Sequence, residues 1–416
     1  SRSIIEAYGK TPDVSDVENA VEISGKGISA TINCEQILIG NDKLMTDNDI
    51  PFHKCHHSGT QIHIAIGGDY AGHIVIFDEI KSTAQKAIDA IRSCGVKNIV
   101  MLTGDNENVA SVVAGKLGIS DYKSQLLPNE KVEILEEYLA LGNTAMTGDG
   151  VNDAPSIKAA DIGVGMGITG TDVTKNVADM VLADDNFATI VAAVGEGRRI
   201  YDNIRKAIQF LLASNMSEVL GVFSATLLGF TLLNPVHLLF INLITDCFPA
   251  LALGMEEAEP DTMNRPPRDS KEGIFAGGMA VDIAYQGALI TLITILSYIL
   301  GHCFEVGYFE MPKGVSPHGM TMAFLTMSMC EIFHSFNLRS QRKSVFSLHS
   351  HNKILWAAML GSLVLTTVVL EVPFVAAMFG FTPVGLGEYL LAIALAVVVI
   401  PVVETVKFVQ RKMAKR

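Results

Sequence analysis

From residue 210 onward the sequence is dominated by long apolar runs. A helix needs about 20 mostly apolar residues to cross a bilayer, and six runs reach or approach that length. A chain with this pattern folds as a helical bundle whose outer surface faces lipid. We therefore expect residues 206–416 to form an all-α transmembrane domain of a multi-pass integral membrane protein, with six spans at 210–230, 235–254, 279–301, 319–337, 354–379 and 386–407.

Lysine and arginine accumulate in three of the segments that flank these runs. Such segments stay on the cytosolic side of a membrane. An even number of spans then places both ends of the chain in the cytosol, and we expect a bacterial cell membrane as the location. The basic residues are Arg265, Arg268 and Lys271 after the second run, Arg339, Arg342 and Lys343 after the fourth, and Lys407, Arg411, Lys412, Lys415 and Arg416 after the sixth.

Polar residues interrupt the first two apolar runs at helical spacing. Asn215 and Glu218 are three residues apart in the first run, and Asn242, Thr245 and Asp246 follow an i, i+3, i+4 pattern in the second. A charged side chain at mid-bilayer costs roughly 2.5–3.5 kcal/mol, so two carboxylates need a compensating partner. All five side chains offer oxygen, which hard cations such as calcium prefer. The pattern predicts a site for a transported cation.

The fourth run carries Ser328 and Glu331, again three residues apart, and His334 one turn later. Glu331 could be a further cation ligand, could line a proton path, or could serve helix packing. The residues alone do not decide among these three roles.

Residues 71–205 alternate short apolar strands with helical stretches. This order predicts a parallel doubly wound α/β sheet, and we count the strand HIVIF, residues 73–77, as its first. Chemistry in such sheets takes place at the carboxyl ends of the strands. Two turns, Thr103-Gly104-Asp105 and Thr147-Gly148-Asp149, should lie at such ends.

The string TGDGVNDAP at residues 147–155 is the most specific motif in the chain. Asp149 and Asp153 are four residues apart at a glycine-rich turn, where they can hold a magnesium ion against a phosphate. Lys131, in the sequence PNEK, offers a point charge for the same phosphate. These residues predict a magnesium-dependent phosphate site.

The strings LTGD, PNEK and TGDGVNDAP together resemble the phosphorylation domain of P-type ATPases, a branch of the haloacid-dehalogenase-like hydrolases. The resemblance implies that Thr103, within Thr103-Gly104-Asp105, and Lys131 contact an aspartyl phosphate. It also implies that Asp149 binds Mg²⁺, with Asn152 and Asp153 in support.

Residues 1–70 resemble part of the same family's nucleotide-binding domain. Gly25 and Gly27 flank Lys26 in a turn where the backbone would approach ATP. The cluster of His53, Cys55, His56 and His57 is interpreted as a surface loop rather than as a metal site.

The resemblance extends to two branches of the family. Residues 1 to about 146 are similar to heavy-metal (zinc/cadmium) pumps, through the GKG turn and the stretch FDEIKSTAQKAIDAIRSCGV. From about residue 165 the chain is similar to calcium pumps, through SNMSEV, NLITDCFPALALG and NRPPR. The function that this implies is part of an ATP-driven calcium pump. A zinc or cadmium exporter, a natural hybrid and a join of two genes are the alternatives.

Several family features are missing from the sequence. No DKTGT string, which carries the phosphorylated aspartate in the family, occurs in it, so we expect a fragment that is inactive alone. Calcium pumps that carry two ions have a carboxylate at the position of Ser328, so we expect one calcium per cycle. A formal net charge of -13 argues against a nucleic-acid partner. We expect a monomer whose partners are the lipid bilayer and the cation.

Overall fold

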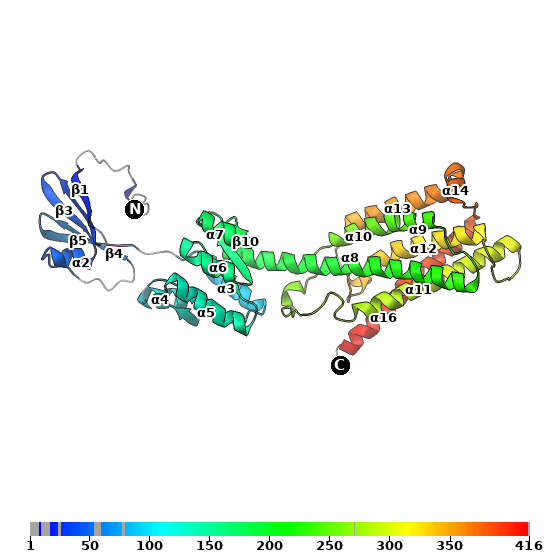
Figure 1. Cartoon of the computed structure of the whole chain (residues 1–416), viewed down its shortest axis with the longest axis horizontal. Coiled ribbons are helices and arrows are strands. Elements are labelled where there is room, and N and C mark those ends of the chain that lie inside the picture. Colours follow the sequence, from blue (N-terminus) through cyan, green and yellow to red (C-terminus); the bar gives the residue numbers. More distant parts are fainter. Residues whose placement is uncertain are drawn as a thin grey trace. The chain divides into compact units, whose positions relative to one another are not determined.

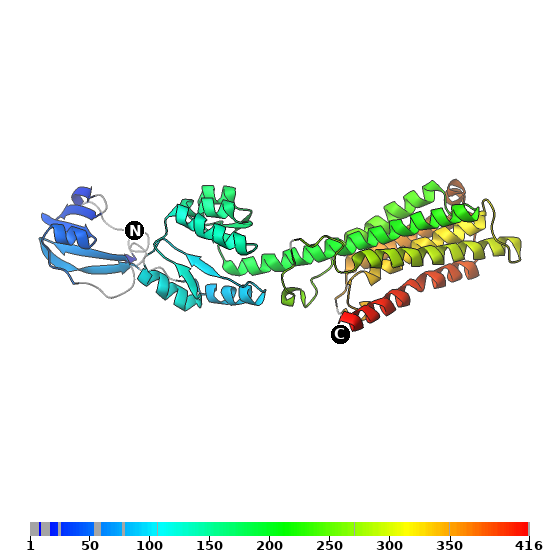
Figure 2. The ribbon, with the colours of Figure 1, turned by 60° about the horizontal axis from the view of Figure 1, so that its bottom comes forward.

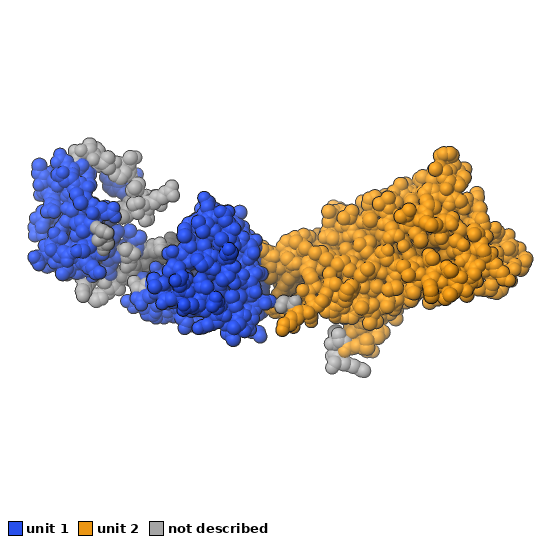
Figure 3. Space-filling view, in the orientation of Figure 1, with its two compact units in different colours: residues 1–191 blue, residues 192–416 orange. Residues whose placement is uncertain are grey.

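The computed structural model describes residues 8–9, 17–23, 26–53, 60–76, 80–105, 107–269, 271–348 and 350–414. Gly25, Cys55, His56 and His57 therefore lie outside the described residues. The chain forms two compact units, residues 1–191 and 192–416, which Figure 3 shows in different colours. The finer division expected at residues 70 and 205 stays a prediction.

Unit 1 begins with a five-stranded antiparallel meander, in the order β1-β2-β3-β4-β5, and one short helix. Leu38, Leu44, Met45, Ile50 and Ala65 form its core. The elements are β1 (Val17–Ile23), β2 (Gly27–Ile32), β3 (Glu35–Gly40), α2 (Asp42–Asp47), β4 (Thr60–Ile66) and β5 (Asp69–Ile76).

The assignment of HIVIF to a parallel sheet is wrong. Its residues 73–76 belong to β5, which pairs antiparallel with β4, with His63 opposite His73. Gly67 and Gly68 connect the two strands, and both have positive φ (61° and 93°). A two-residue turn with positive φ at both positions joins neighbouring antiparallel strands, because its twist matches theirs. This glycine pair is the signal that the sequence prediction overlooked.

The rest of unit 1 alternates strands and helices, as expected from the sequence (Figure 1). Its strands form two parallel sheets, β10-β9-β8 and β6-β7, rather than one continuous sheet. The elements are α3 (Ala84–Ser93), β6 (Val100–Leu102), α4 (Glu107–Leu117), β7 (Asp121–Lys123), α5 (Pro128–Leu141), β8 (Ala145–Gly148), η1 (Val151–Asp153), α6 (Ala154–Ala159), β9 (Ile162–Met166), α7 (Asp172–Val177) and β10 (Met180–Leu182).

Unit 2 is a helical bundle (Figure 2). The long helix α8 (Phe187–Leu228) begins just before the unit boundary and runs through the bundle. The remaining helices are α9 (Pro235–Phe240), the π-helix η2 (Ile241–Asp246), α10 (Cys247–Gly254), α11 (Met279–Val306), α12 (Pro317–Asn337), α13 (Lys353–Glu371), α14 (Pro373–Phe379), α15 (Leu386–Val397) and α16 (Val399–Ala414), with single turns η3 (Thr262–Asn264) and η4 (Val345–Ser347).

Five helical stretches in the described residues are long and apolar enough to cross a membrane. The expected fourth span is also helical, as α12, but it does not reach that apolarity. Its residues 319–332 are all buried within the bundle, so this helix needs no lipid-facing apolar surface. The five stretches are Phe187–Leu228, Pro235–Gly254, Met279–Val306, Lys353–Glu371 and Leu386–Met413.

Candidate functional site

Three carboxylates meet inside the bundle of unit 2. Glu218 comes from α8, Asp246 from the end of η2, and Glu331 from α12. One oxygen from each lies within 4.8 Å of the other two, and the residues are only 8%, 1% and 0% exposed. Within the described residues, no lysine or arginine forms an ion pair with any of them. Three acidic groups so close together in an apolar interior require protons or a cation between them.

Two hydroxyl groups hold this cluster together. Ser214 Oγ lies 3.0 Å from Asp246 Oδ1 and 2.6 Å from Glu331 Oε1. Thr245 Oγ1 donates to Glu331 Oε2 at 2.7 Å. A hydroxyl has a single proton, so Ser214 cannot donate to both of its carboxylates at once. In one of the two contacts, therefore, either a protonated carboxyl group donates to the Ser214 oxygen or a bound cation replaces the hydrogen bond.

The two asparagines predicted as ligands behave differently. Asn242 Nδ2 lies 2.8 and 2.9 Å from the two oxygens of Glu218, so this amide positions the carboxylate. Asn215 is exposed, and its Nδ2 donates to the backbone oxygen of Leu211 on its own helix. The structure thus brings Glu218, Asn242, Thr245, Asp246 and Glu331 together but leaves Asn215 outside the group.

The backbone is irregular where the site forms. Residues 241–246 adopt a π-helix between the α-helical segments α9 and α10. Such widened turns occur mostly as single insertions, and frequently at functional sites. Pro249 in α10 has no N–H to offer to the carbonyl four residues earlier, that of Thr245. A distorted helix therefore lies next to the carboxylates, with Pro249 shortly after it.

Unpaired oxygen atoms at the same place support a cation. Asp246 Oδ2 and Ser328 Oγ are buried and have no hydrogen-bond partner in the described part of the chain. A buried carboxylate oxygen without a partner loses its hydration without compensation. The available donors are carboxylate and hydroxyl oxygens, the set that a hard divalent cation prefers.

The phosphate turns of unit 1 lie where the sequence placed them, at the carboxyl ends of β6 and β8. Lys131 on α5 and Asp153 in η1 are brought together, with Nζ and Oδ1 2.7 Å apart. Both side chains are largely buried. The carboxylate of Asp149 is exposed and makes no hydrogen bond or ion pair among the described residues. Asp153 is thus the partner of the lysine, whereas Asp149 and Asn152 are exposed.

The other turn is internally braced. Thr103 Oγ1 donates to Asp105 Oδ2 at 2.9 Å, and the backbone of Thr103 is bonded to Lys123 and Leu126. No hydrogen bond or ion pair joins this turn to Lys131 or Asp153 in the described ranges.

Gly27 has a structural reason to be glycine. A Cβ at this position would lie 2.2 Å from the oxygen of Ile39 and 2.5 Å from Cα of Gly40 on β3, and φ is +149°. Its small size is thus explained by close backbone packing of β2 against β3. A role of Gly27 in binding ATP stays a prediction.

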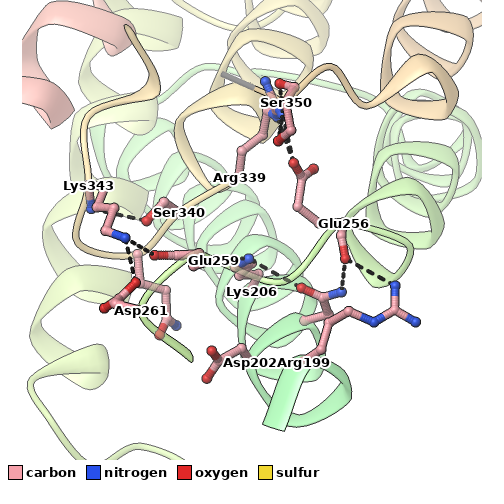
Figure 4. Close-up of polar contacts among 12 residues, drawn as sticks. Arg199, Asp202, Lys206, Glu256, Glu259, Asp261, Arg339, Ser340, Lys343 and Ser350 are labelled. Atoms are coloured by element: carbon pink, nitrogen blue, oxygen red, sulfur yellow. Dashed lines mark hydrogen bonds and ion pairs between the residues drawn. The ribbon is translucent and has the colours of Figure 1, made fainter. Parts of the chain in front are cut away.

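Ion pairs fix the end of the bundle that carries the basic loops (Figure 4). Arg339 Nη2 lies 2.7 Å from Glu256 Oε1, and both side chains are buried. Lys343 Nζ lies 2.5 Å from Asp261 Oδ1. Burial raises the pKa of Asp261, but the hydrogen bonds from Lys343 and Arg265 outweigh it and lower the pKa to about 2. These contacts tie the segment after α10 to the segment after α12.

Comparisons with known proteins agree with this division of the chain. A family model described as "Cation transporting ATPase, C-terminus" matches residues 230–409. A model described as "haloacid dehalogenase-like hydrolase" matches residues 1–161. The first covers most of the bundle, and the second covers the region with both phosphate turns.

Two bacterial relatives match most of this chain. "Calcium-transporting ATPase 1" of Bacillus cereus is 37% identical over 380 residues, 82% of this chain and 43% of the relative. "Calcium-transporting ATPase" of Bacillus subtilis is 38% identical over 353 residues, 78% of this chain and 39% of the relative. The chain thus spans less than half the length of these relatives. A match to 82% of the chain is longer than unit 2, so the similarity extends into unit 1.

One solved structure also matches, the catalytic domain of the CPx-ATPase CopB-B, at 27% identity. It covers 45% of this chain and 69% of that chain with a TM-score of 0.37, too low to decide the fold. The family models and the relatives carry the assignment. The chain therefore belongs to the P-type cation-transporting ATPases, corresponds to their C-terminal part, and is homologous to the calcium-transporting members.

Proposed function

We propose that this chain is part of an ATP-driven pump that moves calcium across a bacterial cell membrane. The observation that carries the proposal is the buried group of Glu218, Asp246 and Glu331, which has oxygen donors and no basic partner among the described residues. Three negative charges suit a divalent cation and one remaining proton. Their number supports a single calcium per cycle, with Glu331 as a ligand.

The alternative of a zinc or cadmium exporter finds less support. Zinc prefers thiolate and imidazole ligands. Cys247, one residue after Asp246, is exposed, and its Sγ lies 3.2 Å from the backbone oxygen of Asn242. Cys330 and His334 are buried on α12, but neither joins the group of clustered ligand atoms. The similarity to calcium-transporting relatives also extends into unit 1, so a join of two unrelated genes is not required to explain the chain.

We further propose that α12 is the sixth crossing. Its 21 residues span the bundle, and the helices around it shield its polar side chains from lipid. Six crossings place the basic segments after α10, α12 and α16 on one side, the cytosolic side.

In unit 1, Asp149 would hold Mg²⁺, and Lys131 would neutralise a phosphoryl group, its ammonium positioned by Asp153. The ion supplies charge neutralisation at the phosphate. The phosphorylated aspartate itself would come from a segment outside this sequence, and ATP would be the donor.

The test is ATP-driven uptake into everted membrane vesicles from cells that express the whole gene containing this sequence. We expect accumulation of radioactive calcium and much less of zinc, and its loss in Asp246→Asn. Glu371→Gln, at an exposed position at the end of α13, removes the same charge and gives a matched control variant of the same bundle. Uptake of zinc in preference to calcium, or full calcium uptake by Asp246→Asn, would exclude the proposal.

A further inference from the structure

Three arginines gather at the start of α11, away from the carboxylate cluster. Arg205 Nη2 on α8 donates to the Ala276 oxygen at 2.6 Å, and Arg342 Nη2 donates to the Gly277 oxygen at 2.5 Å. Arg411 Nη1 on α16 donates to the backbone oxygen of Arg342 at 2.6 Å. A Cβ built on Gly277 would lie 3.4 Å from Arg342 Nη2 and 3.8 Å from Arg205 Nη2. The two guanidinium groups therefore converge on one glycine.

These positive charges lack acidic partners. Within the described residues, Arg205, Arg342 and Arg411 form no ion pair, unlike Arg339 and Lys343 nearby. Arg205 Nε is buried and has no hydrogen-bond partner in the described part of the chain. The neighbouring acid, Asp282, accepts a hydrogen bond from Gln410 at 2.6 Å, and it interacts with Arg342 through the charges alone, without an ion-pair contact. Like charges repel, so an anion bound among the three arginines would stabilise the arrangement.

The backbone adds donors at the same place. α11 has 28 residues and begins after Gly278, a glycine whose missing side chain cannot cap the first-turn N–H groups. The start of a helix also carries partial positive charge. The two guanidinium groups and this helix start therefore face the same small region around Gly277.

The position of the cluster specifies the kind of anion. Arg205 lies on α8 before its apolar part, Arg342 follows the end of α12, and Arg411 lies in the last turn of α16, all on the side of the basic loops. Exposed apolar side chains flank the same ends, among them Phe275, Val281, Phe408 and Met413. A ligand that offers a phosphate to the arginines and acyl chains to these residues satisfies both features. Basic pockets between membrane helices on the cytosolic side bind anionic lipid headgroups.

We propose that Arg205, Arg342 and Arg411 form a binding site for the phosphate of an anionic phospholipid of the cytosolic leaflet. The site holds the start of α11 against α8 and α16. It lies apart from the cation cluster and does not depend on which ion is transported.

Native mass spectrometry of the 416-residue chain in neutral detergent tests the proposal. Equal amounts of phosphatidylglycerol and phosphatidylcholine of the same acyl chains are offered. We expect one phosphatidylglycerol to be retained in preference to phosphatidylcholine. Each arginine near an anionic surface contributes about fivefold to binding, so the double variant Arg205→Gln/Arg342→Gln should lower retention by about 25-fold.

The control variant Lys271→Gln/Lys412→Gln removes the same charge from exposed positions outside the cluster and should retain the lipid. Arg342→Lys should keep most of the binding, since it keeps the charge. The proposal is overturned if the unmodified chain retains the two lipids equally. It is also overturned if the arginine double variant retains as much phosphatidylglycerol as the control variant. Displacement of the lipid by millimolar inorganic phosphate would assign the cluster to a free phosphate and would also overturn it. If the double variant does not fold, two other measurements test the proposal: the lipid preference of the unmodified chain and that of Arg411→Gln.

Discussion

At the residue scale, a single hydroxyl group links two carboxylates of the bundle, because Ser214 Oγ contacts both Asp246 and Glu331. Glu218 and Asp246 stand out in apolar runs because a charge there requires a partner. A serine in such a run has an equally plausible packing role, so no local pattern distinguishes Ser214 from the other serines. Asn215 was selected from its spacing to Glu218, but it is exposed on its helix, because the buried face passes through Ser214, Ser217 and Glu218.

Replacing Ser214 by alanine should weaken calcium binding. Its hydroxyl touches both Asp246 and Glu331, and a hydrogen bond to a charged group contributes roughly 1.5–3 kcal/mol, or about a tenfold to hundredfold change in affinity. Equilibrium dialysis of radioactive calcium against the purified chain measures the change. Ser217→Ala is the matched control, since Ser217 is equally buried on α8 but donates to the backbone oxygen of Ser214. Equal affinities in the two variants would remove Ser214 from the site.

Asp185 should make unit 1 sensitive to acid. The backbone N–H of Ile168 and then that of Thr169 lower the pKa of Asp185 to about 2, against the opposing effect of burial. A carboxylate with a lowered pKa stabilises the fold above its ordinary pKa near 4, and this stability is lost as the pH falls from about 4 through about 2.

Hydrogen exchange at the amides of Ile168 and Thr169 reports this effect. In the unmodified chain, exchange should become less protected, relative to the intrinsic rate, between pH 4 and pH 2. Asp185→Asn should lose protection already at neutral pH and show little further change. The exposed Glu133→Gln should behave like the unmodified chain. Protection that is independent of Asp185 would contradict the assignment.

At the scale of elements, helices and parallel strands follow from periodicity, but their partners do not. The apolar run 354–379 reads as one helix, and the structure divides it at Pro373 into α13 and α14. The strand at 73–76 was assigned to the wrong sheet because its apolar alternation fits either environment. Only the Gly67-Gly68 turn reveals its antiparallel partner. The central position of α12 was not predictable either, since its burial depends on all the surrounding helices.

Close packing of α11 on α12 should be intolerant of added volume. A Cβ on Gly301 would lie 2.9 Å from Cα of Gly319 and from the Met322 side chain. Backbone cannot move aside as a flexible side chain can, so Gly301→Ala should cost about 1–3 kcal/mol, the usual effect of overpacking.

Thermal unfolding of the purified chain in detergent measures that cost. The control is Gly361→Ala on α13, where a Cβ would meet nothing within 4 Å. There alanine replaces glycine in an open helical position and should be neutral or slightly stabilising. A Gly301→Ala variant as stable as Gly361→Ala would show that the two helices are not in close contact.

At the scale of the whole molecule, the two units carry different parts of one proposed cycle. Unit 1 holds the lysine and aspartate that would act on a phosphate, and unit 2 holds the carboxylates that would bind the cation. Family motifs made both assignments possible from the sequence. The hydroxyl contacts, the π-helix and the arginine cluster depend on how distant segments pack, which no local pattern records.

The central claim is that the carboxylates of unit 2 bind calcium. Its most direct test is equilibrium binding of radioactive calcium to the purified chain at neutral pH, with the double variant Asp246→Asn/Glu331→Gln beside it. The account predicts saturable binding of one calcium per chain that an equal concentration of zinc does not displace, and its loss in the double variant. Undiminished binding in that variant, or preferential displacement by zinc, would contradict the account.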